Sequence, residues 1–124
     1  MQFSSTISNC LSGFAANMEM PLETQPDGSV SFTLSQSGML IFTPARQGES
    51  IVVSLSRPLN QNERTELLQV LQKAGYKVEL GNNLHMALDR DENLYFSAML
   101  SSSQVTTPTI ERTVDYLIEA ARLN

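Results

Sequence analysis

The chain has 124 residues, with eight Lys and Arg, thirteen Asp and Glu, and a formal net charge of −5 at pH 7. Nucleic-acid binding requires clustered basic residues, so this acidity argues against a nucleic-acid partner. The length predicts one domain, residues 1–124, with one modest hydrophobic core. The single cysteine, Cys10, excludes an intrachain disulfide and favours a reducing compartment.

The N-terminal region lacks the features of a targeting signal. The first basic residue is Arg46, so no basic segment precedes an apolar stretch. The longest apolar runs, such as residues 39–42, are too short to cross a bilayer. We therefore expect a cytoplasmic protein without membrane insertion.

A helix is predicted over residues 3–17, because apolar side chains recur there at spacings of three and four. Pro21 ends it, since the residue before a proline avoids helical dihedral angles. Residues 25–28 (Gln-Pro-Asp-Gly) then predict a turn, in which Pro26 sets a negative φ and Gly28 permits a positive one. The apolar stripe of the helix consists of Phe3, Ile7, Cys10, Leu11, Phe14 and Met18.

Three short antiparallel strands are predicted next. From Ser29 the hydrophobic period becomes two, which is typical of a strand with one buried face. Strands at 39–43 and 51–55 complete a meander. The strand at 39–43 is apolar on both faces, so its two sets of side chains must contact different layers of the molecule. The alternating residues are Val30, Phe32 and Leu34 in the first strand, then Met39 and Ile41 on one face of the second strand and Leu40 and Phe42 on the other.

A second helix is predicted over residues 61–74. Asn60 and Glu63 have the spacing of a capping box, and Gly75 stands where a left-handed C-cap belongs. The apolar residues of this helix cover an arc broader than one sheet needs, which indicates that part of the arc contacts another subunit. Residues 76–80 alternate weakly and are interpreted either as a short edge strand or as an extended linker.

A hairpin and a closing helix complete the chain. Residues 84–88 and 94–100 alternate as strands on either side of a polar turn. Thr107 and Pro108 are typical of a helix start. The whole pattern predicts an α+β fold, α-β-β-β-α-β-β-α, with a twisted antiparallel sheet packed by helices. The apolar stripe of the closing helix consists of Ile110, Val114, Leu117, Ile118 and Ala121.

Few residues of this chain are suited to covalent chemistry. Cys10 lies in an apolar stripe, where a thiol behaves as a small hydrophobe, and a lone His85 does not make a metal site. Asp89, Asp91 and Asn93 resemble the start of a calcium loop, but Leu replaces both its required Gly and its last Glu. We interpret this segment as a solvated hairpin turn. No catalytic residue, metal site or cofactor is predicted.

Several local patterns resemble those of one bacterial protein family. They are a helix running into Asn-Met-Glu-Met-Pro-Leu (17–22), the sheet-opening segment Asp-Gly-Ser-Val-Ser-Phe-Thr-Leu (27–34), and Asn-Leu-His-Met-Ala-Leu-Asp (83–89) paired with Leu-Tyr-Phe (94–96). In these segments and in element order the chain resembles the class I chaperones of bacterial type III secretion, the group that includes the Tir chaperone. Glu19 stands where that family commonly has Gly.

The resemblance implies a function. Class I chaperones are homodimers that bind the non-globular N-terminal segment of a secreted effector in the bacterial cytoplasm, keep it soluble and fit for export, and use no cofactor. We therefore expect two partners, a secreted effector protein and a second copy of this chain. A small ligand-binding or regulatory α+β domain without catalysis is the alternative, and an enzyme is the least supported function.

Two sets of apolar residues are candidates for these contacts. We expect an extended effector segment to place apolar anchors in pockets lined by the first helix and the meander, with main-chain pairing at a sheet edge. The internal Met residues either form an adaptable surface or fill the core. The partner-binding candidates are Leu34, Leu40, Phe42 and Val52, and the dimer-interface candidates are Leu68, Leu71, Tyr95 and Met99.

Overall fold

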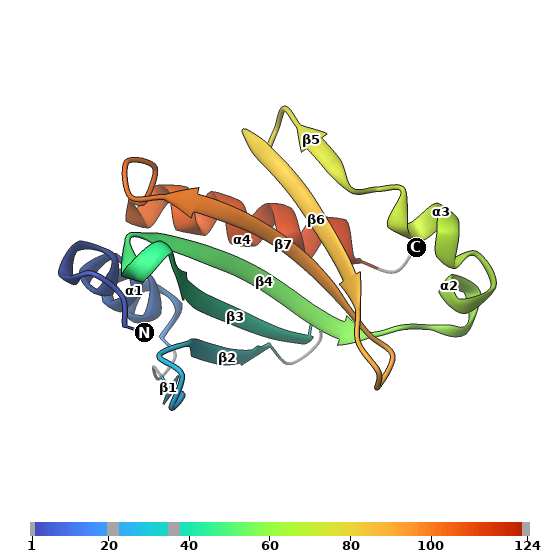
Figure 1. The fold of residues 1–124 in the computed structure, drawn as a ribbon, viewed down its shortest axis with the longest axis horizontal. Coiled ribbons are helices and arrows are strands. Elements are labelled where there is room, and N and C mark those ends of the chain that lie inside the picture. The colour runs from blue at the N-terminus through green and yellow to red at the C-terminus, as the bar shows by residue number, and fades with distance from the viewer. Residues whose placement is uncertain (1, 20–22, 35–37, 123–124) are drawn as a thin grey trace.

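The computed structural model describes residues 2–19, 23–34 and 38–122 of the chain. It consists of one antiparallel sheet with helices on one of its faces and at one end (Figure 1). The predicted helix stop at Pro21 lies outside the described residues. In chain order the elements are α1 (Ser5–Met18), β1 (Glu23–Thr24), β2 (Val30–Leu34), β3 (Gly38–Ala45), η1 (Arg46–Gly48), β4 (Ser50–Pro58), α2 (Gln61–Thr65), α3 (Leu67–Leu71), β5 (Gly75–Lys77), β6 (Asn82–Leu88), β7 (Asn93–Ser101) and α4 (Thr107–Ala121).

The sheet has seven strands in the order β1-β2-β3-β4-β7-β6-β5, with all neighbours antiparallel. The predicted meander is β2-β3-β4, and the predicted hairpin is β6-β7. The two units join because β4 pairs with β7 from Ser50 opposite Ser101 to Pro58 opposite Asn93. The α+β class with a helix-packed antiparallel sheet is therefore confirmed. The sequence did not predict β1, a two-residue strand at the edge of the sheet.

The core lies between the sheet and the helices α1 and α4, which lie behind the strands in Figure 1. At its centre, the Phe14 ring from α1 makes edge contacts with two rings of the sheet, Phe32 at 5.9 Å and Phe42 at 5.5 Å between centroids. Burying a side chain of this size contributes roughly 1.5–3 kcal/mol. The largest fully buried side chains are Phe14, Phe42, Phe96, Ile7, Leu11, Leu40, Ile51, Leu55, Leu84, Leu94, Leu100 and Ile110.

Both ends of α1 are fixed by local hydrogen bonds. The Ser4 side chain accepts a bond from the Ile7 amide and caps the N-terminus. At the other end Glu19 adopts a left-handed conformation with φ 55°, and its amide donates to the carbonyls of Ala15 and Ala16. A non-glycine residue in this conformation costs roughly 1–2 kcal/mol. A left-handed C-cap explains why glycine suits this position in the resembled family.

The prediction of one continuous helix over 61–74 is wrong. The segment forms two five-residue helices, α2 and α3, separated at Glu66, where φ is −117° and ψ is 35°. A helix of marginal length depends on a buried stripe for its stability, and the only buried residue within 61–71 is Val70. The capping box of Asn60 and Glu63 is confirmed, whereas Gly75 begins β5 and does not cap a helix.

Two other local predictions need adjustment. Of residues 76–80, Tyr76 and Lys77 belong to β5 and pair with β6, and the chain then turns. Thr106, not Thr107, caps α4, because its side chain accepts from the Thr109 amide at 3.2 Å. The Thr107 hydroxyl instead donates to the carbonyl of Cys10 in α1 at 3.5 Å. Within the described parts of the chain, no helix is long and apolar enough to cross a membrane.

Candidate functional site

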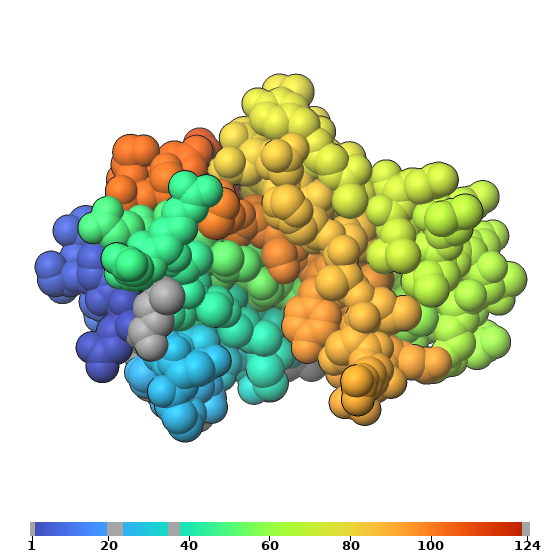
Figure 2. All heavy atoms as spheres, viewed as in Figure 1, coloured from blue at the N-terminus to red at the C-terminus, as the bar shows by residue number. Residues whose placement is uncertain are grey.

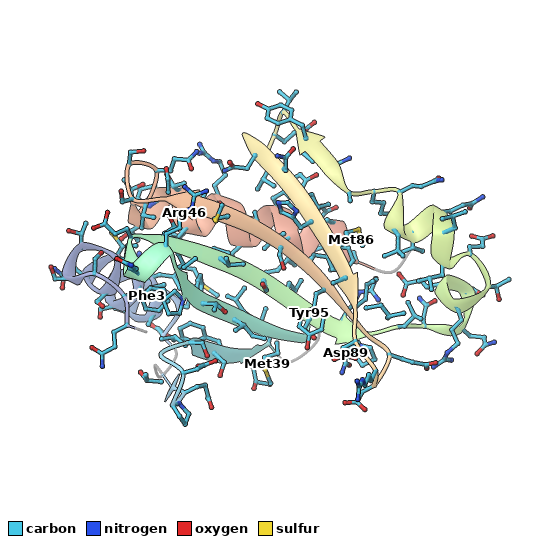
Figure 3. The ribbon with its side chains drawn as sticks, in the orientation of Figure 1. Phe3, Met39, Arg46, Met86, Asp89 and Tyr95 are labelled. Atoms are coloured by element: carbon cyan, nitrogen blue, oxygen red, sulfur yellow. The ribbon has the colours of Figure 1, made fainter. Side chains whose placement is uncertain are left out.

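The second face of the sheet, opposite α1 and α4, carries apolar side chains that no described helix covers (Figure 1). Figure 3 shows Met39 and Tyr95 on this side, and Met39 is 42% exposed. Figure 2 shows the same side as a surface hollowed over β3 and β4, between the turn before β2 and the β6–β7 hairpin. We call this surface the open face, and its apolar residues are Met39, Ile41, Val52, Tyr95 and Met99.

A pair of hydroxyl groups lies at the centre of the open face. Ser54 and Ser97 are cross-strand partners, and their side-chain oxygens are 2.8 Å apart. Each hydroxyl therefore has a hydrogen-bond partner within the sheet, although Ser54 is buried. The surrounding Met39, Val52 and Met99 present thioether and methyl groups to solvent, so an apolar partner would meet no unsatisfied polar side chain at this centre.

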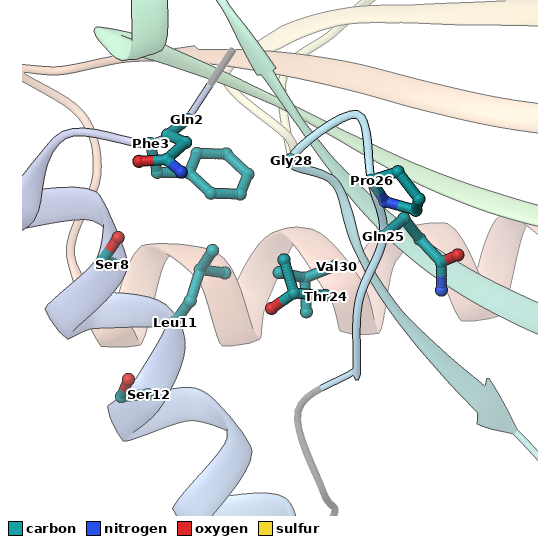
Figure 4. A pocket seen from close by; sticks show the side chains of 10 residues that line it. All are labelled: Gln2, Phe3, Ser8, Leu11, Ser12, Thr24, Gln25, Pro26, Gly28 and Val30. Carbon is teal, nitrogen blue, oxygen red and sulfur yellow. The ribbon is translucent and has the colours of Figure 1, made fainter.

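A cavity of about 410 Å³ lies on the other side of the sheet, beside the N-terminal half of α1. Figure 4 shows the Phe3 ring over Leu11, facing the strand residues Thr24 and Val30. We call this cavity the α1 pocket. The described residues that line it carry no charge: Gln2, Phe3, Ser8, Leu11, Ser12, Thr24, Gln25, Pro26, Gly28 and Val30.

The wall of the α1 pocket formed by Gln2 and Phe3 is held by a distant turn, η1. The Ser4 amide donates to the Gly48 carbonyl at 3.0 Å. Gly48 has φ 85°, and a Cβ at this position would lie 2.1 Å from the Gln2 carbonyl oxygen. Only glycine fits this close approach, so Gly48 determines where the N-terminal residues cross the end of the sheet.

A third surface is the projecting segment that we call the arm, residues 61–78. In Figure 1, α2 and α3 extend beyond one end of the sheet. Its apolar side chains are unusually exposed, with Leu68 at 73% and Val78 at 81%, and Tyr76 is exposed as well. Large apolar side chains exposed on one segment are candidate positions for contact with other proteins.

The eight predicted contact residues separate into four groups. Leu40 and Phe42 are 1% and 0% exposed on the helix side of the sheet, so we assign them to the core and not to a partner-binding surface. Leu34 is half-buried and packs against that core. Val52, Tyr95 and Met99 share the open face, where Val52 lies opposite Met99, whereas Leu68 and Leu71 lie on the arm.

The sequence did not identify several residues of these surfaces. Phe3 was assigned only to a helix stripe, and nothing local indicates that Gly48 brings it over a cavity. The alternation did separate Met39 and Ile41 from their neighbours, but it could not say which set faces the helices. Met86 is half-buried against the core, whereas Met39 and Met99 are surface residues. Some Met residues therefore fill the core and others are available for an adaptable surface.

The residues considered for covalent chemistry are not brought together. Cys10 is half-buried in α1, with its sulfur 3.9 Å from the Val105 carbonyl oxygen. His85 is exposed and pairs with Ser97, which places it on the open face, across the sheet from α1. Across residues 2–19, 23–34 and 38–122 there is no group of three His, Cys, Asp or Glu that could hold a metal ion.

Asp89 organises the β6–β7 turn. Its Oδ1 accepts bonds from the amides of Asn93 and Asp91 at 2.9 Å each, and its Oδ2 accepts from the Asn93 side chain and the Tyr95 hydroxyl at 3.2 Å each. The bond from the Asn93 amide makes the largest contribution to lowering the pKa of Asp89 below its usual 3.8. The carboxylate is thus engaged within the turn.

The variant Asp89→Asn is expected to unfold at a lower temperature than the wild type at neutral pH. The pKa of Asp89 is depressed on folding, so its stabilisation is present above 3.8 and is lost as the pH falls through the folded-state value. The deficit should therefore shrink on acidification, measured as Tm by circular dichroism from about pH 7 to about pH 2.5. Asp91→Asn, in the same turn, is the control. A deficit that does not change with pH would contradict the prediction.

Comparison with solved structures identifies the fold. The Yersinia pestis type III secretion chaperone SycH, in complex with a stable fragment of YscM2, is 18% identical with a TM-score of 0.71, covering 93% of this chain and 96% of that chain. For the ExsC–ExsE complex the identity is 17% and the TM-score 0.74, with coverage of 98% and 92%. For the ExoU–SpcU complex from the type III secretion system of Pseudomonas aeruginosa, the identity is 16% and the TM-score is 0.58, covering 88% of this chain and 89% of that chain.

At these identities the structural matches show a shared fold. No curated protein sequence matches the chain. The sequence profile of the Tir chaperone protein (CesT) family, however, matches residues 9–123, which is nearly the whole chain. The predicted resemblance is therefore confirmed, and the chain belongs to the Tir chaperone protein (CesT) family.

Proposed function

We propose that this protein is a type III secretion chaperone of the bacterial cytoplasm that binds the non-globular N-terminal segment of a secreted effector and keeps it soluble and export-competent. Family membership supports this function, as do similar solved structures in which SycH and SpcU are in complex with another protein. The observation that carries the proposal is apolar surface outside the core, on the open face and in the α1 pocket. The proposed activity is binding without catalysis.

The α1 pocket is the proposed anchor site for the effector. Its floor and wall are apolar, formed by Leu11, Val30 and Phe3, and its rim carries uncharged hydroxyl and amide groups. This lining suits an apolar side chain followed by uncharged polar residues. It gives less support to the alternative, a small ligand-binding or regulatory domain, because such a domain needs a closed pocket and this pocket is open to solvent.

The edge of the sheet beside the α1 pocket offers main-chain pairing. β1 is the first strand in the sheet order, and among the described strands it pairs only with β2. An edge strand exposes amide and carbonyl groups that an extended peptide can pair with. A segment anchored in the α1 pocket can therefore continue along β1 and reach the open face, where Met39 and Met99 adapt to different side chains.

Filling the α1 pocket is expected to release the effector. In the variant Ser12→Arg, a long side chain replaces an exposed residue of the pocket rim, and the captured effector should fall about tenfold, the loss of one good anchor contact. The measurement is copurification with the tagged chain from the bacterium that encodes it, followed by quantitative mass spectrometry.

The matched control is Asn9→Arg, which places the same side chain on an exposed position of α1 outside the pocket lining. Effector capture should equal that of the wild type. The proposed function fails if no secreted protein copurifies with the wild type. The proposed anchor site fails if Ser12→Arg captures as much effector as Asn9→Arg.

We further propose that the protein is a homodimer that associates through the arm. Leu71 is half-buried against the core, but Leu68 is 73% exposed and Tyr76 is exposed as well. Leaving such residues in water is unfavourable, and a second copy provides a matching apolar surface by two-fold symmetry.

A further inference from the structure

We propose that Arg57 and Glu63 form a buried ion pair that sets the direction of the arm relative to the sheet, so that the arm is presented to a second copy of the chain in one orientation. The role of the arm in dimer formation rests on the proposed homodimer. The geometry of the Arg57–Glu63 pair does not depend on that proposal.

Arg57 connects three elements. It lies near the end of β4 on the helix side of the sheet and is only 7% exposed. Its Nε donates to the carbonyl of Ala121, at the end of α4, at 2.5 Å. Its Nη1 and Nη2 donate to the two carboxylate oxygens of Glu63 in α2, each at 2.7 Å, and its guanidinium lies 5.3 Å from the centre of the Phe96 ring. A bidentate bond of this kind fixes angle as well as distance.

Glu63 in turn fixes the start of the arm. Its Oε1 accepts a bond from the Asn60 amide at 3.1 Å, and its own amide donates to the Asn60 side chain at 2.7 Å. The bond from Arg57 is the largest cause that holds the pKa of Glu63 below its usual 4.5, so the carboxylate is charged at neutral pH. One carboxylate therefore caps α2 and ties α2 to β4 and α4.

The far end of the arm is joined to the sheet because β5 pairs with β6. The remaining connections between the helices α2 and α3 and the body are weaker constraints on direction. Val70 is the only buried residue within 61–71, and an apolar contact does not define an angle. Arg64 also bonds Glu92 in the β6–β7 turn, but these side chains are 44% and 51% exposed. Solvent screens an exposed pair, so it constrains direction little, whereas a buried pair left with one partner is strongly disfavoured.

The test compares Glu63→Gln with Arg64→Gln, two variants that each remove one ion pair of α2. Amide hydrogen exchange is measured across the chain by mass spectrometry, and the dimer dissociation constant by sedimentation. Glu63→Gln is expected to accelerate exchange in α2 and α3 while β4 and β7 stay protected, and to raise the dissociation constant by about tenfold. Arg64→Gln should change neither quantity. Arg57→Lys, which keeps the charge but loses the bidentate bond, should behave as Glu63→Gln.

The possible results separate the inference from the homodimer proposal. Unchanged exchange in the arm of Glu63→Gln, or faster exchange throughout β4 and β7 as well, would overturn the role of the pair in setting arm direction. Faster exchange confined to the arm, in a protein whose wild type is a monomer at every concentration, would support the pair and reject the homodimer.

Discussion

Replacing Phe42 by alanine is expected to lower the free energy of unfolding by about 3–5 kcal/mol, the usual cost of deleting a large buried aromatic side chain. Phe42 is fully buried, and its ring makes edge contacts with Phe14 of α1 and Phe32 of β2. The change removes one of the two ring contacts that join α1 to the meander. Because small domains have total stabilities of roughly 5–15 kcal/mol, this variant should be close to unfolding.

Urea denaturation followed by circular dichroism measures this loss, and Met39→Ala is the matched control. Met39 lies three residues earlier on the same strand but on the open face, where 42% of it is exposed. Its replacement should cost less than about 1 kcal/mol, because little buried area is lost. Equal losses for the two variants would show that the open face is as well covered as the core and would remove the basis for a binding surface there.

The contrast between Phe42 and Met39 shows what the sequence alone could predict for the strand at 39–43. Alternation established that the strand has two apolar faces, and that the faces contact different layers. It could not establish which face belongs to the core, because α1 and α4, which cover Leu40 and Phe42, come from the two ends of the chain. Two proposed partner-binding residues were therefore core residues, and their neighbours Met39 and Ile41 form the surface.

The arm and the α1 pocket show why other features were not predictable. A capping box and an apolar arc at 61–74 fit one helix, and no local pattern in the sequence marks the break at Glu66. Arg57 falls in phase with the buried residues Ile51, Val53 and Leu55 of β4, and a charge in that position was a readable signal of a buried pair. The α1 pocket depends on the approach of Gly48 to Gln2, which no local pattern encodes.

The variant Leu68→Asp is expected to convert the protein to a monomer. If Leu68 is buried against a second copy, an unpaired carboxylate there costs several kcal/mol, which raises the dissociation constant roughly a hundredfold or more. Static light scattering after size exclusion should then give 13.7 kDa instead of twice that mass. Within the isolated chain Leu68 is 73% exposed, so the Tm extrapolated to high dilution should hardly change.

The control for this experiment is Met18→Asp, at an exposed apolar position on α1, at the opposite end of the sheet from the arm. It adds the same charge to the same acidic protein, so any general effect of charge repulsion on association appears in both variants. Loss of the dimer in Leu68→Asp alone places the interface on the arm. Loss in both variants, or in neither, would contradict that placement, and the Arg57–Glu63 pair would then hold the arm for a different partner.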